Sequence, residues 1–377
     1  MPARVVILGG GVGGTVVANR LVRRARDRAR VTVVDAAGIH TYQPGFLYVP
    51  FTGDGRRTLG RPERRLLDPR VDLVVDRAAA IDLERREIRL QEGATLRYDA
   101  LVIATGSRLA PEEVPGLEEG AHHFYTLDAA ERLHAVLERF SGGRIVIGVA
   151  GLPYKCPPAP LEFTFLLDDY LRRRGLRDRT VIQYLSPLPR VFPIEPVALL
   201  VDPLLRARGI DVVTMFNVDS VDPRARTVSS LEGETLPYDL LVLIPPHRGV
   251  EVVRACGLGD PEGWVPTDRE TLAALRVPGV YAIGDATDLP VSKSGSAAHF
   301  EAHVVADNLA SELAGAPAAR RYDGRVTCFL ETGRGQASLL LFDYTHPPRP
   351  RRPSVLYHLA KAALGSLYWI AVPTGLV

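Results

Sequence analysis

Apolar and polar positions along the chain predict strands and helices in alternation. An apolar strand over 4–8 leads into a glycine-rich turn, a helix that reaches about residue 26 and a second strand over 30–34. A strand, a helix and a strand within about thirty residues predict a βαβ unit with parallel strands.

A second region of the same kind follows. The run "YDLLVLI" at 238–244 repeats "YDALVIA" at 98–104, and this repeat indicates two similar units. The chain is therefore predicted to be an α/β protein with two Rossmann-like, three-layer domains, the second inserted in the first. The expected parts are 1–107 with 245–315, 108–244, and a C-terminal segment over 316–377. In the second unit, helices are expected over 128–140, 160–173 and 196–208, and strands over 144–149, 180–185 and 211–216.

Shorter patterns account for the remaining segments. A basic, proline-containing stretch at 53–69 predicts a loop with a short helix. A strand over 280–283 precedes a helix over 296–313, and the tail from residue 322 contains two strand-like runs before an apolar end. Alternating positions predict short antiparallel strands over 71–75, 77–82 and 87–90.

The first turn carries a dinucleotide motif. Gly9, Gly11 and Gly14 form G-x-G-x-x-G, and Gly13 lies within the same turn. Glycines permit a tight turn close to a pyrophosphate, and the N-terminus of the following helix faces the phosphates. Asp35 ends the next strand about twenty residues later, where an acid binds ribose hydroxyls. This context favours a dinucleotide site over a glycine-rich turn of another α/β protein.

The composition of the chain excludes some classes of function. The net charge of +2 gives no electrostatic case for nucleic acid. The three cysteines form no CxxC pair, so we expect no zinc site, and they are predicted to be thiols, ligands or a redox pair. No signal-peptide pattern precedes the first strand, and we expect the protein to work in the cytoplasm.

Two later segments resemble a known family. "ATG" at 104–106 and "YAIGDA" at 281–286 follow the glycine motif in the order that is typical of the glutathione-reductase-like flavoproteins, which have two dinucleotide-binding domains. The resemblance implies FAD as the cofactor. It also implies that FAD-binding residues include Ala78, Thr105, Gly106, Gly284 and Asp285.

The corresponding turn of the second unit departs from this pattern. Members of the family that use NAD(P)H repeat the glycine motif there, whereas this chain has Gly148 and Gly151 followed by "LPYKCPPAP". Prolines do not suit a smooth helix start on a pyrophosphate. We therefore expect this domain not to bind a nicotinamide.

This altered turn resembles sulfide:quinone oxidoreductases and flavocytochrome c sulfide dehydrogenases. The resemblance extends to "GDATDLPVSK" at 284–293 and "YDGRVTCFLET" at 322–332. It implies that Cys156 and Cys328 form a redox pair over the flavin, and that hydrosulfide attacks their disulfide. Lys155 is expected to favour the thiolate of Cys156. The alternative is that each cysteine only packs, as we expect of Cys256.

The surroundings of the flavin follow from the same resemblance. No cysteine lies between 107 and 156 or near 40–46, so FAD is predicted to be held non-covalently, with Gln43 and Pro44 lining its pocket. The helix over 296–313 is expected to point its N-terminus at the flavin, assisted by Lys293. His299, Glu301 and His303 on that helix are expected to be surface residues rather than proton donors to a quinone.

The apolar C-terminus at 355–377 predicts contact with a membrane. Its uninterrupted part is short for a spanning helix. Tyr357, Tyr368 and Trp369 suit the interface of a membrane with water. We expect a monotopic helix that places the protein peripherally on the inner face of the cell membrane. The alternative is a core helix or the dimer helix of a homo-oligomer.

Together these features predict an FAD enzyme that oxidises sulfide to sulfane sulfur and reduces a membrane quinone. A type II NADH:quinone dehydrogenase is the first alternative, and it would tolerate loss of the cysteines. A soluble sulfide dehydrogenase that reduces a cytochrome is the next. A further alternative, in which the protein is not an enzyme, is a non-catalytic flavin-bound sensor or assembly protein.

Overall fold

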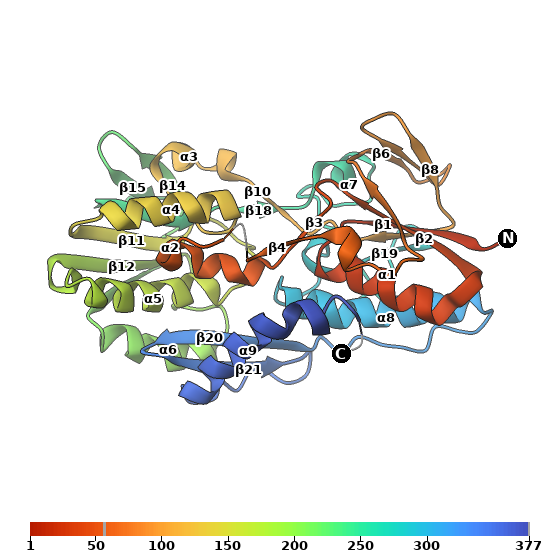
Figure 1. Cartoon of the computed structure of the whole chain (residues 1–377). Helices are drawn as coiled ribbons and strands as arrows, with labels where there is room; N and C mark the ends of the chain where they lie inside the picture. The colour runs from red at the N-terminus through yellow and green to blue at the C-terminus, as the bar shows by residue number, and fades with distance from the viewer. Residues whose placement is uncertain (56–57, 376–377) are drawn as a thin grey trace.

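Two parallel sheets form the two lobes of the chain (Figure 1). The computed structural model describes residues 1–55 and 58–375. The first sheet has the order β19-β9-β1-β2-β5, and all its neighbouring strands are parallel. Helices α1 (Val12–Ala25) and α8 (Gly295–Leu313) pack together against it. Its strands are β1 (Ala3–Leu8), β2 (Ala29–Asp35), β5 (Asp72–Val75), β9 (Ala100–Ile103) and β19 (Val280–Ala282).

The second sheet has the order β13-β12-β11-β17 and is also parallel. All four strands lie between β9 and β19 in the chain, so the second lobe is inserted in the first, and the predicted fold class is confirmed. The residue boundaries of the domains stay a prediction. The elements are β11 (Gly143–Val149), β12 (Thr180–Ser186), β13 (Ile210–Thr214), β17 (Leu240–Ile244), α4 (Leu127–Arg139), α5 (Ala159–Arg173) and α6 (Glu195–Arg206).

One predicted strand was assigned to the wrong kind of sheet. The run over 71–75 was expected to be antiparallel, but β5 pairs in parallel with β2. Leu73 and Val74 pack against apolar clusters on opposite faces of the first sheet, as in a parallel strand that is covered on both sides. The small antiparallel sheet instead consists of β6 (Ala78–Asp82), β7 (Glu87–Leu90) and β8 (Thr95–Arg97).

Small elements connect the lobes. β10 (Arg108–Leu109) pairs antiparallel with β18 (His247–Arg248) at the two crossings between the lobes. The predicted loop over 53–69 contains a strand and a short 3₁₀ helix, and its residues 56–57 lie outside the described residues. The other short elements are η1 (Arg26–Arg28), β3 (Ile39–Thr41), η2 (Gln43–Leu47), α2 (Val49–Thr52), β4 (Gly60–Pro62), η3 (Glu63–Arg65), η4 (Pro111–Glu113), α3 (Leu117–Gly120), η5 (Arg177–Arg179), β14 (Val218–Asp222), β15 (Thr227–Ser230), β16 (Thr235–Pro237), α7 (Glu251–Ala255) and η6 (Gly284–Ala286).

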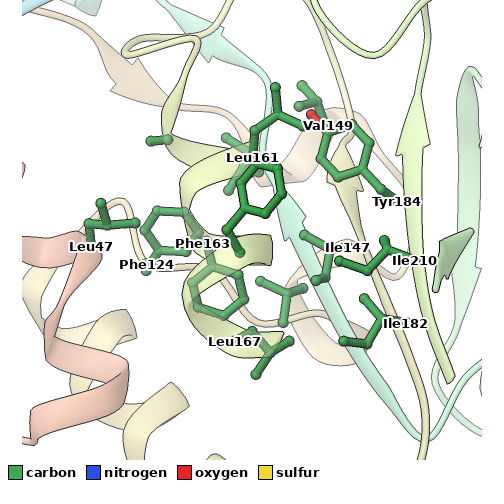
Figure 2. Packing of buried hydrophobic residues seen from close by; sticks show 14 of the residues in the cluster. Leu47, Phe124, Ile147, Val149, Leu161, Phe163, Leu167, Ile182, Tyr184 and Ile210 are labelled. Atoms are coloured by element: carbon green, nitrogen blue, oxygen red, sulfur yellow. The ribbon is translucent and has the colours of Figure 1, made fainter. Parts of the chain in front are cut away.

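The core of the second lobe fixes the position of α5. Phe163 of α5 stacks on Phe124 with ring centroids 4.7 Å apart, and Ile147 of β11 belongs to the same buried cluster (Figure 2). Leu47 of η2 enters this cluster from the first lobe. Burying each such side chain contributes roughly 1.5–3 kcal/mol. The start of α5 is therefore held firmly against the first lobe.

The C-terminal segment runs beneath both lobes (Figure 1). The hairpin of β20 (Val326–Gly333) and β21 (Gln336–Phe342) packs on α5, and α9 (Val355–Ala371) lies on the hairpin. After α9 the chain reaches α1, where the Asn19 side-chain amide donates to the carbonyl of Pro373 over 2.7 Å. The tail thus contacts both lobes.

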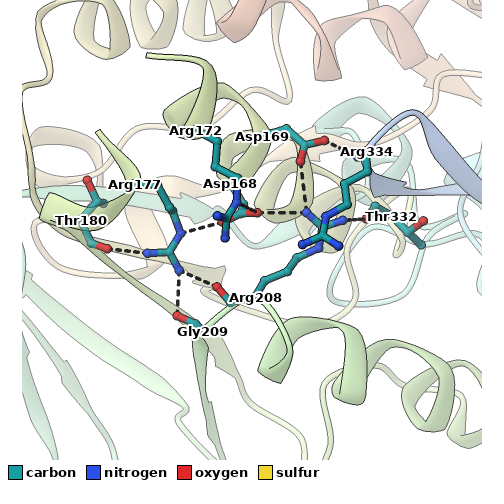
Figure 3. A network of polar contacts seen from close by, with 9 residues as sticks. All are labelled: Asp168, Asp169, Arg172, Arg177, Thr180, Arg208, Gly209, Thr332 and Arg334. Atoms are coloured by element: carbon teal, nitrogen blue, oxygen red, sulfur yellow. Dashed lines mark hydrogen bonds and ion pairs between the residues drawn. The ribbon is translucent and has the colours of Figure 1, made fainter. Parts of the chain in front are cut away.

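A buried ion network joins α5 to this hairpin (Figure 3). Asp168 accepts from Arg177 at 2.6 Å and from Arg208 at 3.0 Å, and Arg208 also donates to the carbonyl of Thr332. Burial raises the pKa of Asp168, but hydrogen bonds from Arg172, Arg177 and Arg208 outweigh it and keep that pKa below its usual range. The carboxylate is therefore ionised and depends on its arginines.

Replacing Arg208 is expected to destabilise the protein strongly. Arg208→Met leaves Asp168 buried with fewer partners, which costs about 3–5 kcal/mol of unfolding free energy. Arg206→Met is the matched control, because Arg206 pairs with Asp202 on the surface and such pairs contribute less than about 1 kcal/mol. Urea unfolding of both variants measures the difference. Equal shifts of the two midpoints would contradict the role given to the network.

Candidate active site

The turn between β1 and α1 requires glycine at two positions. Gly9 has a φ of +108°, and a Cβ there would lie 2.4 Å from the carbonyl oxygen of Ala104. A Cβ on Gly14 would lie 1.9 Å from the carbonyl oxygen of Gly9. The strand and the helix approach so closely that only glycine fits.

Open space lies in front of the N-terminus of α1. Gly11 is the N-cap residue with no side-chain cap, and a Cβ on it would meet no atom within 4 Å. Gly13, by contrast, packs against Ile283. The first backbone N–H groups of a helix have no partner within the helix, so they can bind phosphate oxygens in this space.

Asp35 stands at the end of β2 beside the turn. Its carboxylate accepts from the backbone N–H of Gly10 at 2.8 Å and of Gly38 at 2.7 Å. The N–H of Asp76 donates to the carbonyl of Asp35, and Ala78 begins β6 shortly afterwards. Contact of Asp35 and Ala78 with a nucleotide stays a prediction. Nothing in the G-x-G-x-x-G pattern marks Gly10, whose N–H positions the acid.

Thr105 and Gly106 face the same crevice from the end of β9. The Thr105 hydroxyl is buried and has no hydrogen-bond partner among the residues that the structure describes. Gly106 has a φ of +66°, and a Cβ there would enter open space. The crevice lies at the carboxyl ends of β1 and β9, where the connections of the sheet reverse direction. An unpartnered buried hydroxyl and the open helix N-terminus together fit the phosphates and ribityl chain of FAD.

The segment after β19 closes the crevice. Burial raises the pKa of Asp285, and the charges of Lys155 and Lys293 oppose that rise. The Lys293 ammonium donates to the carbonyls of Asp285 at 3.2 Å and Thr287 at 2.6 Å, and it lies 3.8 Å from the ring centroid of Trp264. Gly284, with a φ of +67°, turns the chain into this segment.

The expectation that Glu301 is a surface residue is wrong. Its side chain is 0% exposed, and Oε2 accepts from the N–H of Gly284 at 2.5 Å. Burial raises its pKa to about 8, although the Gly284 hydrogen bond opposes the rise. His299 and His303 are half-buried, with ring centroids 4.6 Å apart. Because α8 is covered on several sides, its sequence shows no simple polar face.

The turn before α5 differs from the one before α1. In the first lobe α1 begins at Val12, soon after β1 ends at Leu8. In the second lobe β11 ends at Val149, but α5 begins only at Ala159. Cys156 lies in this longer turn with a φ of +50°, a region that residues other than glycine rarely adopt.

One segment touches both predicted redox cysteines. The N–H of Cys156 donates to the carbonyl of Lys293 at 2.7 Å. On β20, the N–H of Thr327 donates to the hydroxyl of Ser296 at 2.9 Å, next to Cys328. Both thiols pack on the same buried cluster, and the charge of Cys156 raises the pKa of Cys328. The fold thus brings together two cysteines that are far apart in sequence, while Cys256 lies at the end of α7 in another cluster.

A cation on α9, Lys361, acts on Cys156. Burial raises the pKa of Cys156 to about 12, Glu162 raises it further and Lys361 lowers it. Lys155, the lysine expected from sequence, donates to the side-chain oxygen of Gln43 at 2.9 Å. Its effect on the thiolate stays a prediction, as does the contact of Gln43 and Pro44 with FAD.

A buried polar cluster lies under α9 and was not predicted from the sequence. Glu162, 3% exposed, pairs with Lys361 and accepts from the N–H of Glu331 at 2.8 Å. Glu331 in turn contacts His358 at 3.0 Å and accepts from the Tyr48 hydroxyl at 2.9 Å. The only sequence signal was Lys361 and His358 within an otherwise apolar run.

The outer face of α9 is apolar and exposed. Tyr368 was expected at an interface, but it is 5% exposed and faces inward. No helix in the described parts of the chain is long and apolar enough to cross a membrane. The exposed apolar residues are Val355, Leu356, Leu359, Leu364, Leu367 and Ile370.

Comparison with known proteins covers nearly the whole chain. A family described as pyridine nucleotide-disulphide oxidoreductase matches residues 3–306. The mitochondrial sulfide:quinone oxidoreductase of Mus musculus is 30% identical over 386 residues, which span 97% of this chain and 85% of the relative.

Solved structures agree in fold. The sulfide:quinone oxidoreductase of Aquifex aeolicus superposes with a TM-score of 0.89 at 23% identity, over 99% of this chain and 92% of that one. The NDH2 of Plasmodium falciparum, solved with NADH, gives a TM-score of 0.76 at 13% identity, over 100% and 96%.

Gly11→Ala is expected to weaken FAD binding without disturbing the fold. The new methyl group meets no protein atom but fills the space in front of α1. We expect the dissociation constant for FAD to rise at least about tenfold, with an unchanged unfolding midpoint of the apoprotein. Fluorescence titration of the apoprotein with FAD measures this. Unchanged affinity would show that the phosphates do not lie at this helix end.

Proposed function

Because the chain belongs to the pyridine nucleotide-disulphide oxidoreductase family, whose members are FAD-binding oxidoreductases, we propose that it oxidises sulfide at Cys156 and Cys328 and passes the electrons through FAD to a quinone. The name of the mouse relative supports this substrate and this acceptor. FAD, when bound, supplies an acceptor for two electrons. The glycine turn, Asp35 and Thr105 would hold it non-covalently.

The placement of the two cysteines carries the proposal. Cys156 belongs to the second lobe and Cys328 to the C-terminal hairpin, yet both adjoin the Lys293–Ser296 segment beside Asp285. Cys156 occupies the turn that would bind the pyrophosphate of a nicotinamide cofactor. A dithiol next to the flavin crevice is suited to exchange with sulfide and to two-electron transfer.

The proposed reaction starts from the protein with Cys156 and Cys328 joined in a disulfide. Hydrosulfide attacks one sulfur of the Cys156–Cys328 disulfide, so that a persulfide forms on one cysteine and the other leaves as a thiolate. A second hydrosulfide attacks the outer sulfur of the persulfide and releases HSS⁻ with a thiol. Reformation of the disulfide releases one proton and two electrons, which FAD would accept when bound.

Glu162 is the carboxylate placed to take that proton. It is buried, and its charge acts on both Cys156 and Cys328. A thiol with a pKa near 12 is a poor nucleophile at neutral pH, so its reaction requires a base and a nearby cation. Glu162 and Lys361 provide these two groups side by side.

The altered second turn opposes the main alternative. A type II NADH dehydrogenase binds its nicotinamide in the second lobe, where this chain has the longer turn of Cys156 and begins α5 only after Pro158. It would also be indifferent to the cysteines. A non-catalytic sensor would show no reduction of bound flavin by either donor.

Anaerobic bleaching of the flavin tests the proposal. Sulfide is expected to remove the oxidised-flavin absorbance, NADH is not, and quinone added afterwards restores it. Cys156→Ser or Cys328→Ser should slow bleaching by at least about a hundredfold, since no second thiol remains to exchange. Cys256→Ser is the matched control and should bleach like the native protein. Bleaching by NADH in the cysteine variants would establish the alternative instead.

The same assay tests the proton acceptor. Glu162→Gln keeps the shape of the side chain but cannot accept a proton. We expect slower bleaching by sulfide at neutral pH, with the rate recovering as pH rises toward the thiol pKa. A rate equal to that of the native protein at every pH would exclude Glu162 from this role.

We also propose that α9 holds the protein on the inner face of the cell membrane. Its apolar residues form the outer surface of the tail, and the exposed Arg349, Arg351 and Arg352 precede it. Such an arrangement suits a helix lying among acyl chains with its cations at anionic headgroups. It would let a quinone enter from the bilayer beside the flavin.

Vesicle flotation tests the membrane contact. Leu356→Ser combined with Ile370→Ser removes two apolar side chains that are 71% and 72% exposed, and binding to anionic vesicles should fall at least about tenfold. Leu199→Ser, on α6 and also 71% exposed, is the control and should leave binding unchanged. Equal binding of all variants would place the membrane contact elsewhere.

A further inference from the structure

A buried polar chain begins at the phosphate turn itself. The hydroxyl of Thr15 lies 2.8 Å from the carbonyl oxygen of Gly11 and 3.2 Å from that of Gly10. It also lies 2.6 Å from Oε1 of Glu63. Thr15 and Glu63 are both 0% exposed. The carboxylate therefore contacts the backbone of the turn through a single hydroxyl group.

The chain continues to α9 through a histidine. Nδ1 of His40 lies 3.1 Å from Oε2 of Glu63, and Nε2 lies 2.6 Å from the hydroxyl oxygen of Tyr368. Burial raises the pKa of Tyr368, so its hydroxyl keeps the proton. Nδ1 of His40 also lies 3.1 Å from the Thr15 hydroxyl, and when the Nδ1–H is donated to the Glu63 carboxylate, Nε2 accepts from Tyr368. Each group has a partner, and His40 is 0% exposed.

The end of the tail is fastened to the same helix. Asn19 donates to the carbonyls of Pro373 and Leu66, at 2.7 Å and 2.8 Å. One turn along α1, Arg23 donates to the carbonyl of Thr374. Helix α1, whose N-terminus lies at the glycine turn, therefore also holds the segment that follows α9.

None of these groups takes part in the proposed sulfide chemistry. Buried polar groups cost free energy unless they are hydrogen-bonded, and losing one partner typically costs about 1–3 kcal/mol. Four such side chains join the turn to α9, and Thr15 contacts both Glu63 and His40. The arrangement suits mechanical coupling between the turn and the tail.

We infer that Thr15, Glu63, His40 and Tyr368 form a latch through which the docked helix α9 holds the FAD phosphate turn in its binding geometry. These are positioning residues, since they act through the turn and not on reacting atoms. The inference rests on the proposed binding of FAD and is independent of the electron donor. Because coupling between two sites is reciprocal, bound FAD must also hold α9 in place.

Tyr368→Phe tests the latch with the loss of one hydroxyl group. We expect the dissociation constant for FAD to rise about tenfold, measured by fluorescence titration of the apoprotein, because Nε2 of His40 loses its donor. Tyr357→Phe, on the same helix but half-buried, is the matched control and should bind FAD like the native protein. Native affinity in Tyr368→Phe, with only a lowered unfolding midpoint, would overturn the inference and leave the cluster a structural one.

The reciprocal effect is measured on the native protein. Amide hydrogen exchange in α9 should be slower with FAD bound than in the apoprotein, whereas exchange in α6, which lies in the other lobe, should change little. Equal exchange in α9 with and without FAD would also overturn the inference. Neither measurement uses sulfide, and bleaching of the native FAD-loaded protein tests the sulfide reaction separately, so failure of the latch is distinguishable from failure of the sulfide reaction.

Discussion

The pairing of Glu162 with Lys361 is the interaction on which the site depends. A carboxylate buried at the start of α5 is costly without a partner, and the ammonium of Lys361 provides one only when α9 is docked. The same ion pair sets the charge around the thiols, because Glu162 raises and Lys361 lowers the pKa of Cys156. Packing of the tail and reactivity of the cysteines therefore depend on the same ion pair.

The inner face of α9 carries several polar side chains that lead to buried carboxylates, as Lys361 does. His358, Lys361 and Tyr368 recur at helical spacing, and each leads to a buried carboxylate of the body of the protein. The outer face is mainly apolar, with Ser366 as an exposed polar residue. The helix is therefore polar inside and apolar outside, the reverse of the usual surface helix. An apolar outer face and a charged inner face suit an element that lies between a protein and a lipid surface.

The sequence predicted the fold and the position of the glycine turn because both depend on local patterns. Glycine spacing after an apolar strand identified the turn at Gly9, Gly11 and Gly14, and the repeated "YD" strands indicated the inserted second domain. The hydrogen-bond and ion-pair partners of buried residues could not be predicted, because Glu162, Glu63 and His40 acquire their contacts from segments far away in the chain. Glu301 was misjudged for the same reason: α8 is packed on several sides, so helical periodicity carries little information about burial.

The insertion of one lobe in the other dictates the order in which the molecule can be completed on the ribosome. Every strand of the second sheet is synthesised before β19 adds the edge strand of the first sheet, so the second lobe is whole while the first still lacks an edge. Residues 355–375 emerge later still. A nascent chain therefore carries its glycine turn long before the tail can contact α1.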